Sequence, residues 1–380
     1  MKALRGFVAT LLLCASPVFG QSIKQSVDDF LKTLSKPTSK ADFDAVPHLS
    51  PLNQDTTLIC WSFATSSFLE SEMERLKMPP VRLSVLYPLY CVFQEKAKRF
   101  VATKGASRFS PGDLFTGVLD MYSVYGAMPA EAYGNKIEGT TTFNHQALYA
   151  ELEQLMAHVK SERLWDEAQV MPKVRAILNK YLGEPPSEFR YQGTTYTPQR
   201  FLHDVVRLPW QEYVLVTSFQ YAPFHQFVEL KVPDNWLHQK TYFNVPLDVF
   251  YGSIKTALQA GYSVAFDADI SEPSYRLTKQ YAVIPPFDCP FNAITAEARE
   301  FRFENESTTD DHLMQFVGFK KFGTEEWFLV KDSWRTAFEG PGKGYMFFHE
   351  SYIKLKVLAI LVHRDAIPDI AALVRSAKTN

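Results

Sequence analysis

The sequence predicts an α+β protein with two lobes, a helical lobe followed by a β-rich lobe. Patterns typical of helices dominate up to about residue 205, whereas short runs of β-branched and aromatic residues dominate after Leu208-Pro209. The chain has 380 residues, 46% of them hydrophobic, so it can bury a large core. A cysteine at a helix start in the first half and a histidine on a strand in the second would meet at the seam between two such lobes.

Residues 1–20 predict a secretory signal peptide. Lys2 and Arg5 precede an apolar run from Phe7 to Leu13, and Val18-Phe19-Gly20 forms a cleavage pattern before Gln21. The run is much shorter than the roughly 20 apolar residues that a membrane-spanning helix needs. We therefore expect a secreted or periplasmic protein without stable membrane insertion.

The segment after the leader, residues 21–47, is polar and charged, and we expect it to lie across the surface of the folded body. The helical lobe is predicted over residues 48–208, with helices at 60–76, 83–103 and 113–125. A helical insertion of about residues 145–205 adds helices at 146–163 and 167–182.

The β-rich lobe is predicted over residues 209–365. Its strand-like runs lie at 213–219, 227–232, 263–268, 313–319, 327–331, 345–348 and 357–362. One helix interrupts them at 245–260 and ends at Gly261. Residues 366–380 form a helix-prone tail. We find no internal repeat.

Cys60 is the candidate nucleophile because it stands where a polar loop enters a helix. Unpaired N–H groups and the helix dipole stabilise an anion there, and the thiolate is the reactive form of cysteine. The alternative is a small buried hydrophobe. Gln54, six residues upstream, favours the catalytic interpretation because its amide NH2 could donate to an oxyanion, alongside the Cys60 N–H.

His312 is the candidate base among nine histidines. It stands on a strand-like run, and the next run ends in Asp332-Ser333-Trp334, which offers a carboxylate to orient the imidazole. The alternative for Asp332 is a strand-end acid paired with Lys331 or Arg335.

These motifs together resemble the papain-type cysteine peptidases, with their glutamine, cysteine, histidine and asparagine stations in the same order. The resemblance is carried by Gln54, by Cys60-Trp61-Ser62-Phe63-Ala64, by His312 before an apolar strand, and by Val330 to Trp334. Within this family, the chain resembles the bleomycin hydrolase and aminopeptidase C branch most. The segments that carry this resemblance are Asn53-Gln54, Leu83-Ser84, Glu95 to Phe100, Phe243 to Leu247, Ala260 to Asp269 and the helical insertion.

The resemblance implies a papain-like fold with a helical lobe and a β-barrel-like lobe. It implies that Cys60 and His312 form a thiolate–imidazolium pair, that Asp332 orients His312, and that Gln54 completes an oxyanion hole. Trp334 would shield the hydrogen bond between His312 and Asp332 from water, and Trp61 would support the site from beside the nucleophile.

Two residues depart from the family's pattern. Asp332 stands where asparagine is usual, and its charge should favour the imidazolium further. Leu58 stands where glycine is common, two residues before the cysteine. Its bulk would narrow the substrate site or alter the loop, and it is the main argument for unusual or lost activity.

The function predicted is an exported cysteine peptidase that acts on peptides or proteins. The resemblance implies an aminopeptidase, but the tail lacks the sequence that anchors the substrate's amino group in that branch. A papain-like endopeptidase and a non-catalytic peptide-binding protein on the same scaffold stay open. The branch often forms hexameric rings, so a homo-oligomer stays open as well.

Charge and motifs argue against other partners. With 40 basic and 42 acidic residues and a net charge of -2, the chain has no excess that favours nucleic acid or an anionic membrane. No metal-ligand spacing or cofactor motif stands out. Cys91 and Cys289 are expected to stay reduced, with a disulfide between them as the alternative, and Cys14 belongs to the leader.

Overall fold

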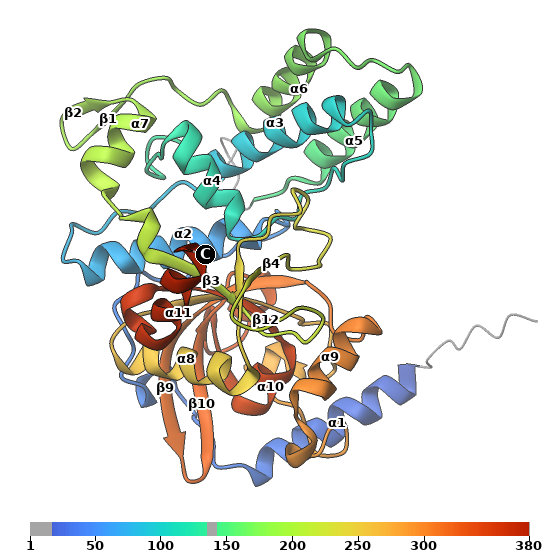
Figure 1. Ribbon diagram of the computed structural model, residues 1–380, viewed down its shortest axis with the longest axis vertical. Helices are drawn as coiled ribbons and strands as arrows, with labels where there is room; N and C mark the ends of the chain where they lie inside the picture. The colour runs from blue at the N-terminus through green and yellow to red at the C-terminus, as the bar shows by residue number, and fades with distance from the viewer. Residues whose placement is uncertain (1–16, 135–142, 380) are drawn as a thin grey trace, which may run out of the picture.

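The computed structural model describes residues 17–134 and 143–379 and has two lobes. Helices form one lobe, a large β-sheet with its own covering helices forms the other, and helix α2 lies at the seam (Figure 1). The predicted two-lobed α+β fold is confirmed. The predicted signal peptide lies largely outside the described residues, and α1 (Pro17–Thr33) begins before the expected cleavage site.

The helical lobe contains the helices that the sequence predicts. They are α2 (Cys60–Arg75), α3 (Leu86–Ala102), α4 (Thr116–Tyr125) and, in the insertion, α5 (Gln146–Ser161) and α6 (Glu167–Leu182). Asp166 caps the start of α6 through its side chain, and Gly183 ends it at a φ of 76°. A short hairpin, β1 (Phe189–Tyr191) and β2 (Thr194–Tyr196), and the helix α7 (Pro198–Phe201) follow.

Helix α2 is buried almost all the way round, from Trp61 to Met73. Its small polar residues face the sheet, where Ser71 Oγ accepts a hydrogen bond from Gln315 Nε2 at 2.9 Å and Ser67 Oγ accepts one from Lys331 Nζ at 2.6 Å. Because buried polar groups need partners, these bonds fix how α2 lies on the sheet.

The sheet has ten strands among the described residues, in the order β4-β5-β3-β12-β6-β9-β10-β11-β8-β7. Its end strands β4 and β7 are not paired with each other, so it is an open ladder and not a closed barrel. The strands are β3 (Tyr213–Thr217), β4 (Phe227–Val228), β5 (Tyr242–Asn244), β6 (Val264–Ala268), β7 (Tyr275–Arg276), β8 (Tyr281–Ala282), β9 (His312–Phe322), β10 (Glu325–Lys331), β11 (Tyr345–His349) and β12 (Val357–His363).

The sheet separates two hydrophobic cores. Ala265 and Leu313 belong to the core on the helical side, whereas Phe266 and Met314 belong to the other core, as the alternation of a strand requires. Four helices, α8 (Leu247–Gln259), α9 (Ala296–Glu304), α10 (Glu350–Lys356) and α11 (Pro368–Thr379), belong to the sheet lobe.

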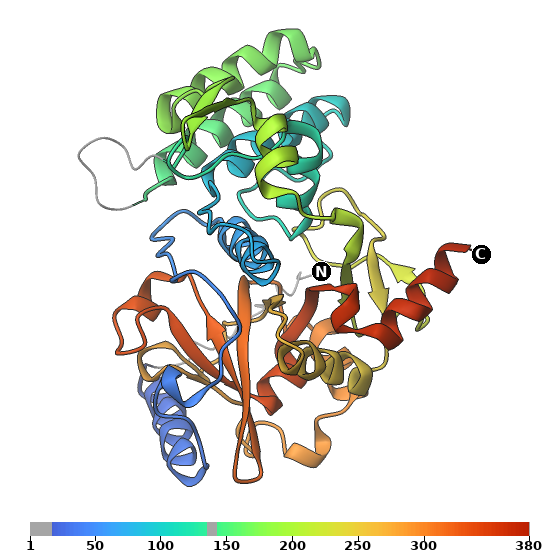
Figure 2. The same ribbon diagram turned by 90° about the vertical axis from the view of Figure 1, so that its left-hand side faces the viewer.

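The N-terminal segment lies along the sheet lobe, where α1 occupies one flank (Figure 2). Val27 and Leu31 are buried in the core of that lobe, and Asp28 accepts two hydrogen bonds from Arg276 at 2.8 and 2.9 Å. This segment is therefore attached to the sheet lobe by an amphipathic helix.

None of the described helices is long and apolar enough to cross a membrane. Cys60, Cys91 and Cys289 are all free thiols, and the last two are buried. Cys91 lies in the helical-side core and Cys289 in the other core. The domain boundaries given above from the sequence stay predictions.

Candidate active site

Cys60 is the first residue of α2 and is partly exposed. The residue before it, Ile59, is the N-cap and makes no side-chain hydrogen bond to the first turn. The backbone N–H groups at this helix start are therefore not occupied by a side-chain cap, which leaves a region of positive potential beside the thiol.

The loop that leads to Cys60 has a constrained backbone. Asp55 and Leu58 both have positive φ, 52° and 54°, in the left-handed region that favours glycine. Leu58 is 48% exposed, so its side chain points to solvent and not into the core. The loop therefore adopts a glycine-type conformation with a leucine in place.

The helical insertion supports this loop from outside. The Phe143 N–H donates to Asp55 Oδ2 at 2.8 Å, and the Thr56 N–H donates to the Phe143 carbonyl at 3.3 Å. Tyr149 of α5 donates its hydroxyl to the Thr57 carbonyl. The sequence did not identify Tyr149, because the side chain lies 89 positions from Cys60 and carries no motif.

Gln54 is buried and is held by Ser333. The Ser333 hydroxyl donates to Gln54 Oε1 at 2.8 Å, and the Gln54 N–H donates to the Ser333 carbonyl at 2.8 Å. Because Oε1 is used as an acceptor, the NH2 group of the amide stays available as the donor that an oxyanion needs. Ser333 was part of the sequence motif, but only the structure assigns it this contact.

His312 and Asp332 form a fully buried pair. His312 Nε2 lies 2.8 Å from Asp332 Oδ1, and both side chains are 0% exposed. Asp332 Oδ1 also accepts from the Trp334 N–H at 2.8 Å, and Asp332 Oδ2 accepts from the Tyr275 hydroxyl at 2.8 Å. The carboxylate therefore has three donors, and it is bonded neither to Lys331 nor to Arg335, the alternative considered above.

The electrostatics of His312 favour its charged form. Burial by itself would lower its pKa, but the charge and hydrogen bond of Asp332, followed by those of Cys60, outweigh burial and raise the pKa to about 10. Nδ1 of His312 has no well-aligned partner among the described residues. Asp332 thus holds Nε2 and leaves Nδ1 for the Cys60 thiol, whose influence on the pKa of His312 places it close to the ring.

The two tryptophans have different positions. The Trp334 ring packs edge-on against the His312 ring, with centroids 5.3 Å apart, which covers the hydrogen bond to Asp332. Trp61 is 0% exposed, and its Nε1 donates to the Pro111 carbonyl at 3.0 Å. Trp61 thus anchors the start of α2 in the helical lobe.

Tyr275 is a site residue that sequence reasoning missed. It is buried on β7, and burial followed by the charge of Asp332 raises the pKa of its hydroxyl well above the usual value. The hydroxyl therefore stays protonated and acts as a donor. No sequence signal could have found it, since β7 has only two residues.

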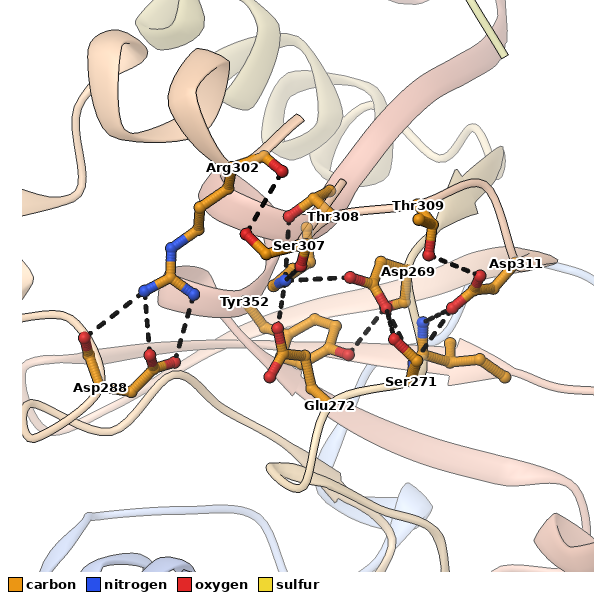
Figure 3. A network of polar contacts seen from close by, with 12 residues as sticks. Asp269, Ser271, Glu272, Asp288, Arg302, Ser307, Thr308, Thr309, Asp311 and Tyr352 are labelled. Carbon is orange, nitrogen blue, oxygen red and sulfur yellow. Dashed lines mark hydrogen bonds and ion pairs between the residues drawn. The ribbon is translucent and has the colours of Figure 1, made fainter. Parts of the chain in front are cut away.

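A polar network with a buried centre at Lys356 and Asp269 fixes the segment that leads into His312 (Figure 3). Lys356 Nζ contacts Asp269 Oδ2 at 2.9 Å, the Ser307 carbonyl at 2.6 Å and Thr308 Oγ1 at 2.9 Å. Asp311 Oδ2 accepts from the backbone N–H groups of Ile270 and Ser271, both at 3.1 Å. These bonds tie residues 307–311 to the end of β6, next to the catalytic candidates.

The described residues contain no group of three or more His, Cys, Asp or Glu side chains that could hold a metal ion. The candidate site brings together the Cys60 thiol, the His312 imidazole, the Asp332 carboxylate and the Gln54 amide. This set can perform nucleophilic acyl transfer.

Comparison with protein families gives a match over residues 26–378, nearly the whole chain, to the Peptidase C1-like family. The chain belongs to this family. The prediction of a papain-type cysteine peptidase family is thus confirmed. A search of curated proteins found no match to this C1-like sequence.

Among solved structures, this C1-like chain is similar to PepW from Lactobacillus rhamnosis HN001, with a TM-score of 0.69 and 17% identity. The match covers 97% of this chain and 93% of PepW, so the likeness in fold extends over nearly the whole chain. Other similar structures are a mite allergen, described for Blo t 1 and Der p 1, and bromelain from Ananas comosus with the inhibitor E64. The allergen has a TM-score of 0.43 and 11% identity, with 90% of this chain and 81% of that chain covered. Bromelain has a TM-score of 0.40 and 13% identity, with 86% and 97% covered.

Proposed function

We propose that Cys60, His312, Asp332 and Gln54 hydrolyse peptide bonds, and that the enzyme acts as an aminopeptidase. The observation that carries the proposal is the position of His312, whose Nε2 lies 2.8 Å from Asp332 Oδ1 and whose pKa is raised by Asp332 and also by the nearby Cys60. Membership in a cysteine peptidase family supports it.

The proposed reaction has two steps, acylation of Cys60 and hydrolysis of the resulting thioester. The Cys60 thiolate attacks the peptide carbonyl carbon, and the Gln54 NH2 with the Cys60 N–H stabilises the oxygen as it becomes negative. The His312 imidazolium gives its proton to the leaving amine as the C–N bond breaks. Water then attacks the thioester, His312 takes up its proton, and the carboxylic acid and the thiolate are released.

Alkylation of native protein with iodoacetamide near pH 5 tests the nucleophile. An activated thiolate reacts at this pH, whereas an ordinary thiol reacts little. Cys91 and Cys289 are buried and serve as internal controls in the same sample. We expect modification at Cys60 alone and its loss in a His312→Ala variant. Equal labelling in the variant would refute the thiolate–imidazolium pair.

Cleavage of a free-amine dipeptide and of its N-blocked counterpart tests the aminopeptidase proposal. A preference for the free amine would support it, and equal rates would support an endopeptidase. The described end of the chain does not provide the anchor that the branch would imply. Ile370 and Val374 of α11 are buried in the core of the sheet lobe, and α11 points away from α2 (Figure 2).

We also propose that the protein is exported after removal of residues 1–20. N-terminal sequencing of protein recovered from outside the cytoplasm should begin at Gln21. A start at Met1 would contradict this.

A further inference from the structure

Two aspartates beside the proposed active site lack the partners that buried acids normally have. Asp267 on β6 is 0% exposed, and its carboxyl oxygens have no hydrogen-bond partner among the described residues other than the carboxyl group of Asp310. Asp310, just before β9, likewise has one buried carboxyl oxygen, Oδ2, without another hydrogen-bond partner among the described residues. The nearby Tyr242 hydroxyl is likewise buried without a partner. Burial is the main cause that raises the pKa of both aspartates, that of Asp310 to about 8, so the free pair holds a proton near neutral pH, and a bound cation could take the place of that proton.

The strand register places the pair next to the reacting groups. Asp267 lies opposite Leu313, and its neighbour Ala268 lies opposite His312. Phe266 and Ala268 belong to the core on the face of the sheet away from the helical lobe. Because side chains alternate along a strand, Asp267 points to the opposite face, towards α2. Burial, the charge and hydrogen bond of Asp310, and the charge of Cys60 raise the pKa of Asp267. The contributions of Asp310 and Cys60 to this pKa require both groups to lie close to Asp267.

An open cavity lies on the Asp310 side of the pair, and its lining also carries the carboxylates of Glu304, Glu306 and Asp311. Asp310 lines a space of about 670 Å³ together with Pro233, Lys231, Thr309 and Phe303. This volume can hold an amino-acid residue. The network of Figure 3 holds the segment that contains Asp310 in place.

The cations in the surroundings are already engaged. Lys96 contacts Asp113 at 3.3 Å and the Ser110 carbonyl at 3.0 Å, and Arg108 lies 3.5 Å from Asp234. No ion pair joins Asp267 or Asp310 to a lysine or arginine within residues 17–134 and 143–379. Lys231, which lines the same cavity, lies over the Tyr221 ring at 4.4 Å from its centroid. A bound ligand could therefore supply the cation that joins both aspartates.

We propose that the Asp267–Asp310 pair binds a cationic group of the substrate, an ammonium or guanidinium that lies on the N-terminal side of the bond cleaved at Cys60. The bound cation would displace the proton held by the pair to solvent, and both carboxylates would then accept charge-assisted hydrogen bonds from it. The inference rests on the proposed peptidase activity. It also supplies the anchor for a free amino group that the tail does not provide.

The cation has two possible sources, the N-terminal α-ammonium of a short peptide and the side chain of a lysine or arginine. Three fluorogenic substrates distinguish them, all with the same residue before the scissile bond. The first has a free amino terminus and norleucine at the preceding position, the second is the same peptide N-acetylated, and the third is N-acetylated with lysine in place of norleucine.

The measurement is the ratio of kcat/KM for each cationic substrate to that for the neutral acetylated one. We expect wild type to prefer one cationic substrate, and Asp267→Asn and Asp310→Asn to reduce that ratio roughly 10- to 100-fold, as the loss of a bond to a charged group implies. Glu297→Gln, which removes an exposed carboxylate from α9 outside the cavity, should leave the ratio unchanged.

Preference for the free amine in wild type would assign the ammonium, and preference for the lysine peptide would assign the side chain. If wild type cleaves the neutral substrate but both aspartate variants keep the wild-type ratio, the inference is wrong while the peptidase proposal stands. If wild type cleaves none of the three and Cys60 is not alkylated near pH 5, the proposed function fails instead. Because asparagine is isosteric and uncharged, the variants should fold, which circular dichroism checks.

Discussion

Replacing Asp332 by asparagine tests how much the carboxylate charge contributes to the state of His312. The amide can keep its oxygen on His312 Nε2, now 2.8 Å from Oδ1, and can direct its NH2 group at the oxygen of Tyr275, which accepts as well as donates. The variant therefore removes a charge and keeps the hydrogen-bond geometry.

The magnitude follows from the type of bond. A hydrogen bond to a charged group contributes roughly 1.5–3 kcal/mol and a neutral one roughly 0.5–1.5 kcal/mol, so the loss is about 1–1.5 kcal/mol. One pKa unit corresponds to about 1.36 kcal/mol, so the pKa of His312 should fall by about one from its value of about 10. Both side chains are fully buried, so solvent does not screen the effect.

The assay is the pH dependence of kcat/KM above pH 7. The imidazolium is the productive form, so activity is lost as the pH rises through the pKa of His312, and the alkaline limb should move down by about one pH unit in Asp332→Asn. At pH 7 both proteins keep the imidazolium, and the rates should agree within a few-fold.

The same pair contributes to folding stability in a defined pH window. Because the pKa of His312 is higher in the folded state than its usual 6.5, the stabilisation is complete below about pH 6.5 and is lost as the pH rises through about 10. The matched control is Tyr275→Phe, which removes a hydrogen bond to Asp332 but keeps the charge, and should move the alkaline limb much less. An unmoved limb in Asp332→Asn would refute the reasoning, and failure to fold would show that the pair is structural.

Three further variants test other parts of the site. Gln54→Ala should lower kcat about 10²–10³-fold by removing an oxyanion donor, measured per Cys60 thiol titrated, and unchanged turnover would exclude Gln54 from the site. Tyr149→Phe should reduce the free energy of unfolding by roughly 0.5–1.5 kcal/mol, measured in urea, because the buried Thr57 carbonyl loses its donor, whereas no change would show that water replaces the hydroxyl. Lys356→Met should lower the free energy of unfolding, measured in urea, by about 3–5 kcal/mol, because it leaves Asp269 as a buried charge without its cation. A variant as stable as wild type would contradict the role given to the network of Figure 3.

The sequence alone determined the larger elements and their order. The predicted helix 167–182 has the bounds of α6, and the predicted helix 60–76 differs from α2 by one residue at its end. Both helices have helix-compatible periodicity and clear end signals, which are local properties of the chain. Cys60, His312 and Asp332 could also be identified from the sequence, because each lies in a short local motif and the motifs follow the family's order along the chain.

The tertiary structure decided what lies between these elements. Strands β5, β7 and β8 have two or three residues each, which is too few for a periodic pattern, and they exist only because neighbouring strands pair with them. For the same reason Tyr275, which contacts Asp332, could not be found from sequence. The closeness of Asp267 and Asp310 likewise follows from the pairing of β6 with β9, because residues 43 positions apart meet only through the register of the sheet.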